Sequence, residues 1–285
     1  MADPEPEGVD EAIAGNLAMW DERAPAHAAS PDYAVQRFVD DPGFISDVVR
    51  FDLPRLGPLE GLRGVHLQCH IGTDTISLAR LGARMTGLDF SPASLTEARR
   101  LAALTATDVV FVQSDVRRAL DVLPPGVFDL VFTGIGALCW LPRVREWAAV
   151  VAALLAPGGR LFLREGHPVL WAVDTARPDG LLVVDEPYFE SEQPVLWEGD
   201  GTYVETDVTF TLSTSHEWNH GLGEIITALL DHGLVLTHLV EHDSVPWEAL
   251  PGRMVKRDDG EWQLLERPER LPTSYTLQAV KPRLG

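Results

Sequence analysis

The amino-acid sequence predicts an α/β fold, a doubly wound sheet of seven strands with an inserted antiparallel β lobe. Two observations carry this prediction. Strand-like and helix-like segments alternate from about residue 60 to residue 165, as in the βα units of a parallel sheet. Between residues 168 and 220 the helical spacing disappears, and short apolar runs are separated by Gly, Pro, Asp and Glu.

The elements of the repeat follow one another at regular intervals. The apolar runs predict five strands, at residues 64–67, 83–88, 109–112, 128–132 and 160–163. The segments between them predict helices at residues 74–81, 92–104, 116–123 and 144–155. Ser91 is expected to cap the second of these helices, and Pro157-Gly158-Gly159 to close the last one. Ligands of such a sheet bind at the carboxyl ends of its strands.

The rest of the chain divides into two flanking parts and a return to the sheet. Ile13, Leu17 and Trp20 lie at helical spacing, which favours an N-terminal helical lid segment in residues 1–58, with Trp20 or Tyr33 as the lid and plain packing on the domain as the alternative. The lobe at residues 168–220 is expected to contain strands at 181–184 and 208–212. A helix at 222–230, with Gly233 as its C-cap, and closing strands at 234–239 and 275–280 follow. The core domain therefore comprises residues 59–167 and 221–285.

Composition excludes several classes of protein. The formal charge of −20, from 43 acidic and 23 basic residues, would repel nucleic acid and anionic lipid. The N-terminus has no apolar signal segment, and no unbroken apolar run reaches the roughly 18 residues of a membrane helix. The two cysteines, Cys69 and Cys139, form no CxxC motif, which fits a reducing compartment. We expect a cytoplasmic protein, and the sequence leaves open whether it forms homo-oligomers.

Residues 66–75, HLQCHIGTDT, connect the first strand to the first helix of the repeat, and we call them the first loop. Loops that hold nucleotides usually contain two or three glycines, whereas this loop has only Gly72. Asp89, 17 residues after Gly72, ends the second strand, where an acid accepts hydrogen bonds from ribose hydroxyls. Asp115 ends the third strand, where it could accept from an adenine amino group or cap the next helix.

Gly72, Asp89, Asp115 and the LAPGGRLFL segment form an ordered set that resembles the class I S-adenosylmethionine-dependent methyltransferases, with their Rossmann-like fold. The resemblance covers residues 60–165 and the closing strands. The segments LQCHIGTDT, LCWLP, REGHP and HEWNHGLGEI look like a bacterial branch of that family. The family's first loop begins with an acid and continues with three glycines; here His66, Gln68 and His70 take the places of the acid and of the first two glycines.

The resemblance implies S-adenosylmethionine as the cofactor and a small molecule as the methyl acceptor. It assigns the cofactor to Trp20, Gln68, Cys69, His70, Gly72, Asp89, Phe90, Ser91, Asp115, Val116 and Thr133. A nucleoside without a pyrophosphate needs fewer glycines, so the first loop argues more against NAD than against S-adenosylmethionine. His70 would lie near the sulfonium, although it could also only shape the loop.

Methyl transfer depends mainly on positioning and on the exclusion of water. Glu165 and His167 follow the fifth strand at the carboxyl edge of the sheet, and we predict a catalytic role for them, with a structural role at the lobe junction as the alternative. Expected substrate contacts are Trp140, Tyr188, Trp197, Trp218 and His220. The aromatic lobe favours a small apolar or aromatic metabolite, natural products and terpenoids included.

One motif suggests a different chemistry. His216-Glu217-Trp218-Asn219-His220 matches the HExxH signature of zinc proteases, in which both histidines share one helix face. The preceding residues are strand-like and Gly221 follows at once, so we predict a strand end and a helix entry without a metal. Two other readings remain open, an NAD-dependent oxidoreductase and a non-catalytic methyltransferase-like binding subunit.

Overall fold

A computed structural model describes residues 8–175, 177, 179–199 and 201–283 of the chain, so residues 1–7 of the predicted N-terminal segment lie outside it. Its main sheet has seven strands in the order β3-β2-β1-β4-β5-β12-β8. Strands β1 to β5 are parallel, and β12 runs antiparallel to both of its neighbours. The predicted seven-stranded α/β sheet is confirmed. Its strands are β1 (Arg63–Leu67), β2 (Arg84–Asp89), β3 (Val110–Gln113), β4 (Phe128–Thr133), β5 (Leu155–Gly166), β8 (Val235–His242) and β12 (Ser274–Val280).

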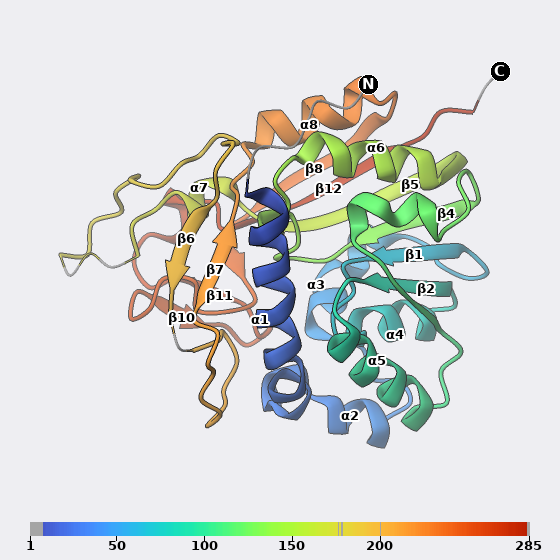
Figure 1. Ribbon diagram of the computed structural model, residues 1–285, viewed down its shortest axis with the longest axis horizontal. Coiled ribbons are helices and arrows are strands. Elements are labelled where there is room, and N and C mark those ends of the chain that lie inside the picture. Colours follow the sequence, from blue (N-terminus) through green and yellow to red (C-terminus); the bar gives the residue numbers. More distant parts are fainter. Residues whose placement is uncertain (1–7, 176, 178, 200, 284–285) are drawn as a thin grey trace.

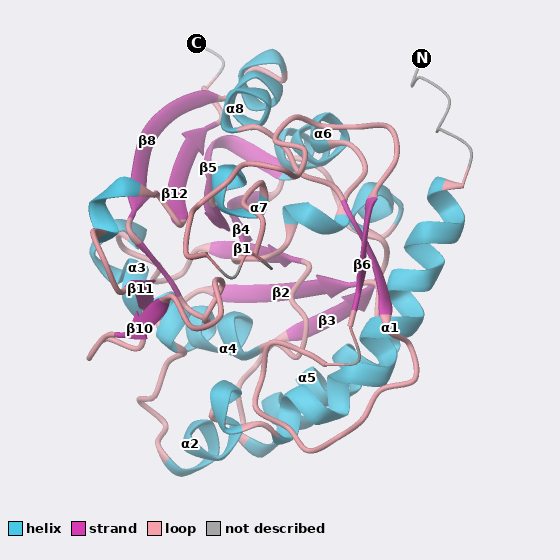
Figure 2. Ribbon diagram, turned by 90° about the vertical axis from the view of Figure 1, so that its left-hand side faces the viewer, coloured by secondary structure: helices cyan, strands magenta, loops and turns pink. Residues whose placement is uncertain are grey.

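Helices cover both faces of this sheet, as Figure 2 shows. One face packs against α6 (Val144–Leu154), α8 (Leu222–Asp231) and the 3₁₀ helix η2 (Val116–Asp121). The other packs against α2 (Val35–Asp40), α3 (Asp47–Leu56), α4 (Thr73–Arg80) and α5 (Pro92–Leu104). Two short elements, η3 (Leu138–Trp140) and α7 (Pro168–Trp171), follow β4 and β5 at the carboxyl edge. The remaining 3₁₀ helices are η1 (Pro31–Tyr33) and η4 (Pro268–Arg270).

Local chemistry explains where the βα elements begin and end. Ser91 caps α5 as predicted, because its hydroxyl accepts a hydrogen bond from the Ser94 amide at 2.9 Å. Gly233 takes a left-handed conformation (φ 78°) after α8, which is the expected C-cap geometry. Among the described residues, no helix is both long and apolar enough to cross a membrane.

The N-terminal helix α1 (Val9–Ala29) lies between the main sheet with its helices and a two-stranded hairpin, β6 (Val195–Glu198) and β7 (Thr214–Glu217) (Figure 1). The strands predicted at 181–184 and 208–212 are wrong. Side chains of α1 explain why residues 208–212 form no strand, because they bind backbone groups that a partner strand would otherwise bind. Glu22 accepts from the amides of Thr211 and Leu212, both at 2.9 Å, and Arg23 donates to the Leu212 carbonyl at 2.9 Å.

A second small sheet lies within the segment that the sequence assigned to the core. Strands β9 (Ser244–Val245), β11 (Trp262–Leu264) and β10 (Met254–Lys256) form it, between β8 and β12 in the chain. It packs against the residues of α7 around a small apolar core that includes Leu170 and Leu250. The sequence analysis did not predict this sheet, because its strands are only two or three residues long.

Candidate functional site

Two residues of the first loop other than glycine adopt a backbone conformation that usually favours glycine. Gln68 (φ 56°), His70 (φ 49°) and Gly72 (φ 80°) all take left-handed conformations. This conformation costs a residue with a Cβ atom roughly 1–2 kcal/mol, because Cβ approaches the following carbonyl oxygen. It persists only where surrounding contacts stabilise it. The two residues that replace the expected glycines therefore follow the same backbone path.

Asp89 lies directly beside this loop, at the end of β2. One carboxylate oxygen accepts a hydrogen bond from the His70 amide at 2.7 Å, and the other accepts from the Ser91 amide at 2.9 Å. Burial raises the pKa of Asp89 to about 6, although these amides oppose the shift. The Phe90 amide also acts on this carboxylate, and because a carboxylate accepts about four hydrogen bonds in all, Asp89 keeps room for a ligand hydroxyl.

Asp115, at the end of β3, caps the next helix. Its carboxylate accepts from the Arg117 amide at 2.9 Å and forms an ion pair with the Arg117 guanidinium at 2.7 Å. Of the two roles that the sequence left open, the helix cap is the one whose contacts are present. Its contact with an adenine stays a prediction, as do the cofactor contacts of Cys69, Phe90 and Val116.

Six aromatic rings lie over the first loop, and we call them the mouth cluster: Trp20, His27, Tyr33, His70, Trp140 and Tyr203. The Trp20 ring lies edge-on to the rings of His70 (5.1 Å between centroids) and Trp140 (5.2 Å). The His27 ring lies 5.0 Å from that of His70 and 4.9 Å from that of Tyr203. Helix α1, the first loop, η3 and the lobe therefore meet at one point.

Two histidines join these parts by hydrogen bonds. His27 Nδ1 lies 2.9 Å from His70 Nε2, and the outer nitrogens contact Thr202 Oγ1 (2.7 Å) and Ser94 Oγ (3.0 Å). Burial lowers the pKa of His27 to about 4 and that of His70 well below its ordinary value. Both rings are therefore neutral at pH 7, where a neutral imidazole can donate from one nitrogen and accept at the other.

Two buried polar atoms at the edge of the sheet have no hydrogen-bond partner among the described residues. They are Gln68 Oε1, after β1, and Thr133 Oγ1, at the end of β4. The amide nitrogen of Gln68 donates to the Ala137 carbonyl at 2.8 Å, which fixes the side chain in place. Buried polar atoms nearly always have partners, so this pair suits a polar ligand that lies across the ends of β1 and β4.

The Glu165 carboxylate is bound by backbone amides, whereas a general base needs an oxygen that can reach the substrate. Its carboxylate accepts four backbone N–H groups, from Gly136 (2.6 Å), Gly166 (2.7 Å), Ala137 (2.8 Å) and Leu138 (2.8 Å). Burial raises the pKa of Glu165, and these four amides oppose that shift. The contacts favour a role in holding the loop after β4, and the predicted catalytic role stays a prediction.

His167 also has both ring nitrogens engaged. Its Nε2 lies 2.9 Å from the Glu241 carboxylate, and its Nδ1 accepts from the Val169 amide at 3.1 Å, which caps α7. Burial lowers the pKa of His167, although Glu241 opposes the shift. These contacts agree with the alternative of a structural role at the lobe junction, and the catalytic role stays a prediction here too.

The five predicted substrate residues separate into two groups. Only Trp140 belongs to the mouth cluster, and its indole N–H donates to the Gly136 carbonyl at 2.8 Å. Trp218 is fully buried, and its amide donates to the Cys139 carbonyl at 2.8 Å. The other three lie in the lobe or at its boundary: Tyr188, whose hydroxyl accepts from Leu222; Trp197, on β6; and His220, which contacts Glu190 and two backbone carbonyls.

The HEWNH segment has the predicted secondary structure. His216 lies on β7, and His220 lies in the link before α8 begins at Leu222. His216 exchanges backbone hydrogen bonds with the Asn16 side chain of α1 at 2.7 and 2.9 Å. The two histidines therefore do not share a helix face, which the zinc signature requires.

Sequence reasoning missed two members of the mouth cluster, His27 and Tyr203. A signal for His27 existed, because it lies seven residues after Trp20 and therefore on the same face of a helix. Tyr203 had no such signal, since it comes from an irregular part of the lobe.

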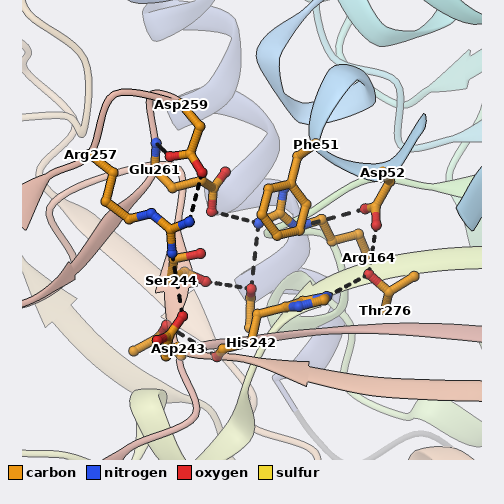
Figure 3. Close-up of polar contacts among 12 residues, drawn as sticks. Phe51, Asp52, Arg164, His242, Asp243, Ser244, Arg257, Asp259, Glu261 and Thr276 are labelled. Carbon is orange, nitrogen blue, oxygen red and sulfur yellow. Dashed lines mark hydrogen bonds and ion pairs between the residues drawn. The ribbon is translucent and has the colours of Figure 1, made fainter. Parts of the chain in front are cut away.

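A buried ion cluster lies on the α3 side of β5 (Figure 3). The Arg164 guanidinium donates to Glu261 at 2.7 Å, lies 3.9 Å from Asp52, and packs 3.7 Å from the centre of the Phe51 ring. Asp52 also accepts from the Thr276 hydroxyl at 2.9 Å. The cluster joins α3, β5, β12 and the small β9–β11 sheet, so loss of one of its charged partners would leave an uncompensated buried charge.

Comparisons with known proteins agree with this geometry. Residues 65–161 match the family model of a methyltransferase domain. A ubiquinone biosynthesis O-methyltransferase from Nitrosococcus oceani is 34% identical over 104 residues, which are 36% of this chain and 43% of that protein. A trans-aconitate 2-methyltransferase from Escherichia coli is 38% identical over 107 residues, 36% of this chain and 39% of that protein. The matches thus span about two fifths of the length of these relatives.

The likeness in structure extends over most of the chain. An S-adenosylmethionine-dependent methyltransferase from Mesorhizobium loti superimposes with a TM-score of 0.59 and 24% identity, covering 82% of this chain and 98% of its own. Residues 65–161 are therefore similar to a methyltransferase domain, and the sheet around them has the fold seen in S-adenosylmethionine-dependent methyltransferases.

Proposed function

We propose that the chain is an S-adenosylmethionine-dependent methyltransferase whose acceptor is a small molecule. The observation that carries this proposal is the first loop, which keeps three left-handed residues next to the Asp89 carboxylate. That carboxylate is held by backbone amides and keeps room for a ribose hydroxyl. Gln68 and Thr133 supply unpaired polar atoms toward the methionine end.

When bound, the cofactor would supply an electrophilic methyl group on sulfur. The residues of this chain would then act by placement and by exclusion of water. Trp20 and Trp140 close the mouth over the first loop, and His27 ties α1 to His70. Glu165 fixes the backbone of residues 136–138, which follow β4 at the carboxyl edge of the sheet, where the cofactor would bind.

A small acceptor is supported by three facts. The two curated relatives are named for small-molecule methylation. The charge of −20 opposes binding to nucleic acid. The rings of the mouth cluster and of the lobe suit an apolar or aromatic acceptor, which includes natural products and terpenoids.

Calorimetric titration with S-adenosylmethionine and with NAD tests the cofactor. We expect the first to bind and the second not to bind. Asp89→Asn should weaken S-adenosylmethionine binding by about 1–3 kcal/mol, because the ribose donors lose a charged acceptor. The exposed Asp108 offers a matched control, and Asp108→Asn should leave affinity unchanged. Equal affinity in the two variants would refute the ribose assignment, and binding of NAD alone would favour an oxidoreductase.

Transfer of an isotope-labelled methyl group to a panel of small phenols, carboxylic acids and isoprenoid alcohols tests the activity. We expect label in at least one acceptor class. If S-adenosylmethionine binds while no acceptor in such panels is labelled, the non-catalytic binding subunit becomes the better description.

A further inference from the structure

The first loop lacks a negative charge at its expected place. His66 stands where the resembling family has an acid at the end of the first strand. Its ring is buried, with Nδ1 2.8 Å from the Thr75 hydroxyl, and burial lowers its pKa to about 3. This position is therefore neutral at pH 7. The cationic amino group of an amino-acid ligand would find no counter-charge there.

A carboxylate nearby reaches the same edge of the sheet from another element. Asp74 lies in the first turn of α4, near the end of the first loop. A Cβ atom placed on Gly134, the first residue after β4, would lie 3.4 Å from Asp74 Oδ2 and 3.4 Å from His66 Nε2. The absence of a side chain at Gly134 thus leaves both groups accessible from the space between the ends of β1 and β4.

The charge of Asp74 is not neutralised by a partner. In the part of the chain that the structure describes, no arginine or lysine forms an ion pair with it. Arg164 acts on the pKa of Asp74 without forming an ion pair with it; the Arg164 guanidinium instead donates to Glu261 and faces Asp52 (Figure 3). Burial raises the pKa of Asp74, and only the Ser46 hydroxyl and this arginine oppose the shift. A half-buried carboxylate without an ion-pair partner suits a cationic ligand.

We propose that Asp74 binds the α-ammonium group at the amino-acid end of the cofactor, together with the unpaired Gln68 Oε1, in place of the acid missing at His66. The proposal rests on the proposed function, since it needs a ligand with an aminocarboxypropyl chain over the first loop. An ammonium group has three donors and no acceptor, which matches a carboxylate and an amide oxygen. Gln68 lies near the start of the first loop and Asp74 near its end.

Two ligands separate the ends of the cofactor. S-Adenosylhomocysteine carries the nucleoside, the sulfur and the amino-acid end, whereas 5′-methylthioadenosine lacks the amino-acid end. Asp74→Asn should lower the affinity for S-adenosylhomocysteine roughly 10-fold to 100-fold, as for a lost charged hydrogen bond, and leave that for 5′-methylthioadenosine unchanged. Asp89→Asn should weaken both ligands, and Asp108→Asn neither.

Equal losses for both ligands in Asp74→Asn, or no loss for either, would overturn the proposal. A further comparison on the wild-type chain covers the case in which that variant does not fold. S-Adenosylhomocysteine should bind more tightly than its analogue without the amino group, and equal affinities would again overturn the role of Asp74. Failure of the wild-type chain to bind any of these nucleosides would instead overturn the proposed function, and this inference with it.

Discussion

Replacing Glu165 with glutamine should destabilise the loop that follows β4. The carboxylate accepts four backbone N–H groups at 2.6 to 2.8 Å, two on each oxygen. Glutamine keeps one acceptor oxygen and turns an NH₂ group toward the other two amides. Two buried N–H groups would then face a donor.

The size of this effect follows from the two lost contacts. Each buried amide left unsatisfied costs about 1–3 kcal/mol. Removing the charge returns part of that cost, because burial already raises the pKa of Glu165 and so disfavours its ionised form. We expect Glu165→Gln to lower the free energy of unfolding by about 3 kcal/mol.

Urea unfolding followed by tryptophan fluorescence measures this loss. Glu217→Gln provides the matched control. Glu217 is a half-buried carboxylate that accepts a hydrogen bond from the Ser215 hydroxyl at 2.9 Å, and burial raises its pKa to about 7. The control should differ little from the wild type at pH 6, where Glu217 is largely protonated. Equal unfolding free energies for the two variants would refute the loop-holding role.

The Glu165→Gln variant also distinguishes a role of Glu165 in holding the loop after β4 from a role as a catalytic base. If Glu165 is a base, Glu165→Gln should keep its stability and its cofactor affinity while turnover falls roughly 100-fold or more. If Glu165 holds the loop, stability should fall together with turnover, and the pH profile of turnover should keep its shape.

Three further outcomes follow from the site. Because burial raises the pKa of Asp89 to about 6, and its ionised form is the stronger acceptor, cofactor affinity should rise between about pH 5 and pH 7 in calorimetric titrations, and Asp89→Asn should make the rise smaller. Burial lowers the pKa of His66 from 6.5 to about 3, so the unfolded chain binds the extra proton between those values. His66 should therefore contribute up to about 1.4 kcal/mol per pH unit to the loss of stability below about pH 6.5 in urea unfolding, and His66→Gln should make the slope less steep by that amount while the other buried histidines still contribute. Gly72→Ala should cost roughly 2–4 kcal/mol, since φ is 80° and the new Cβ would lie 2.9 Å from the Phe111 ring, whereas Gly223→Ala, in open space on α8, should not destabilise the fold.

Periodicity predicted the βα elements well because local chemistry determines them. The helix at residues 92–104 begins after its predicted cap and has the bounds that the sequence indicated. Asp89 was identified for a similar reason, because it ends a predicted strand and lies 17 residues after Gly72. These features depend on neighbours within a few residues, or on the fixed geometry of a parallel sheet.

The lobe and the mouth cluster depend on contacts that sequence spacing does not show. Thr202 contacts His27 across 175 residues, and Arg23 donates to Leu212 across 189. Side chains of α1 thereby take the place of a partner strand along part of the lobe, so apolar runs that are typical of strands stay irregular. The left-handed conformations of Gln68 and His70 were also hidden, because nothing local distinguishes them from ordinary loop residues.

The electrostatics of the proposed site are consistent with a cationic ligand. A sulfonium over the first loop would lie near His27 and His70, and an imidazolium there would repel it. Burial prevents this, because it lowers the pKa of both rings and keeps them neutral at pH 7. The same burial raises the pKa of Asp74 and Asp89, which makes their negative charge costly until a cation or hydroxyl donors arrive. One physical cause, the exclusion of water, thus keeps the His27 and His70 rings neutral and makes the negative charge of Asp74 and Asp89 costly without a ligand that supplies donors.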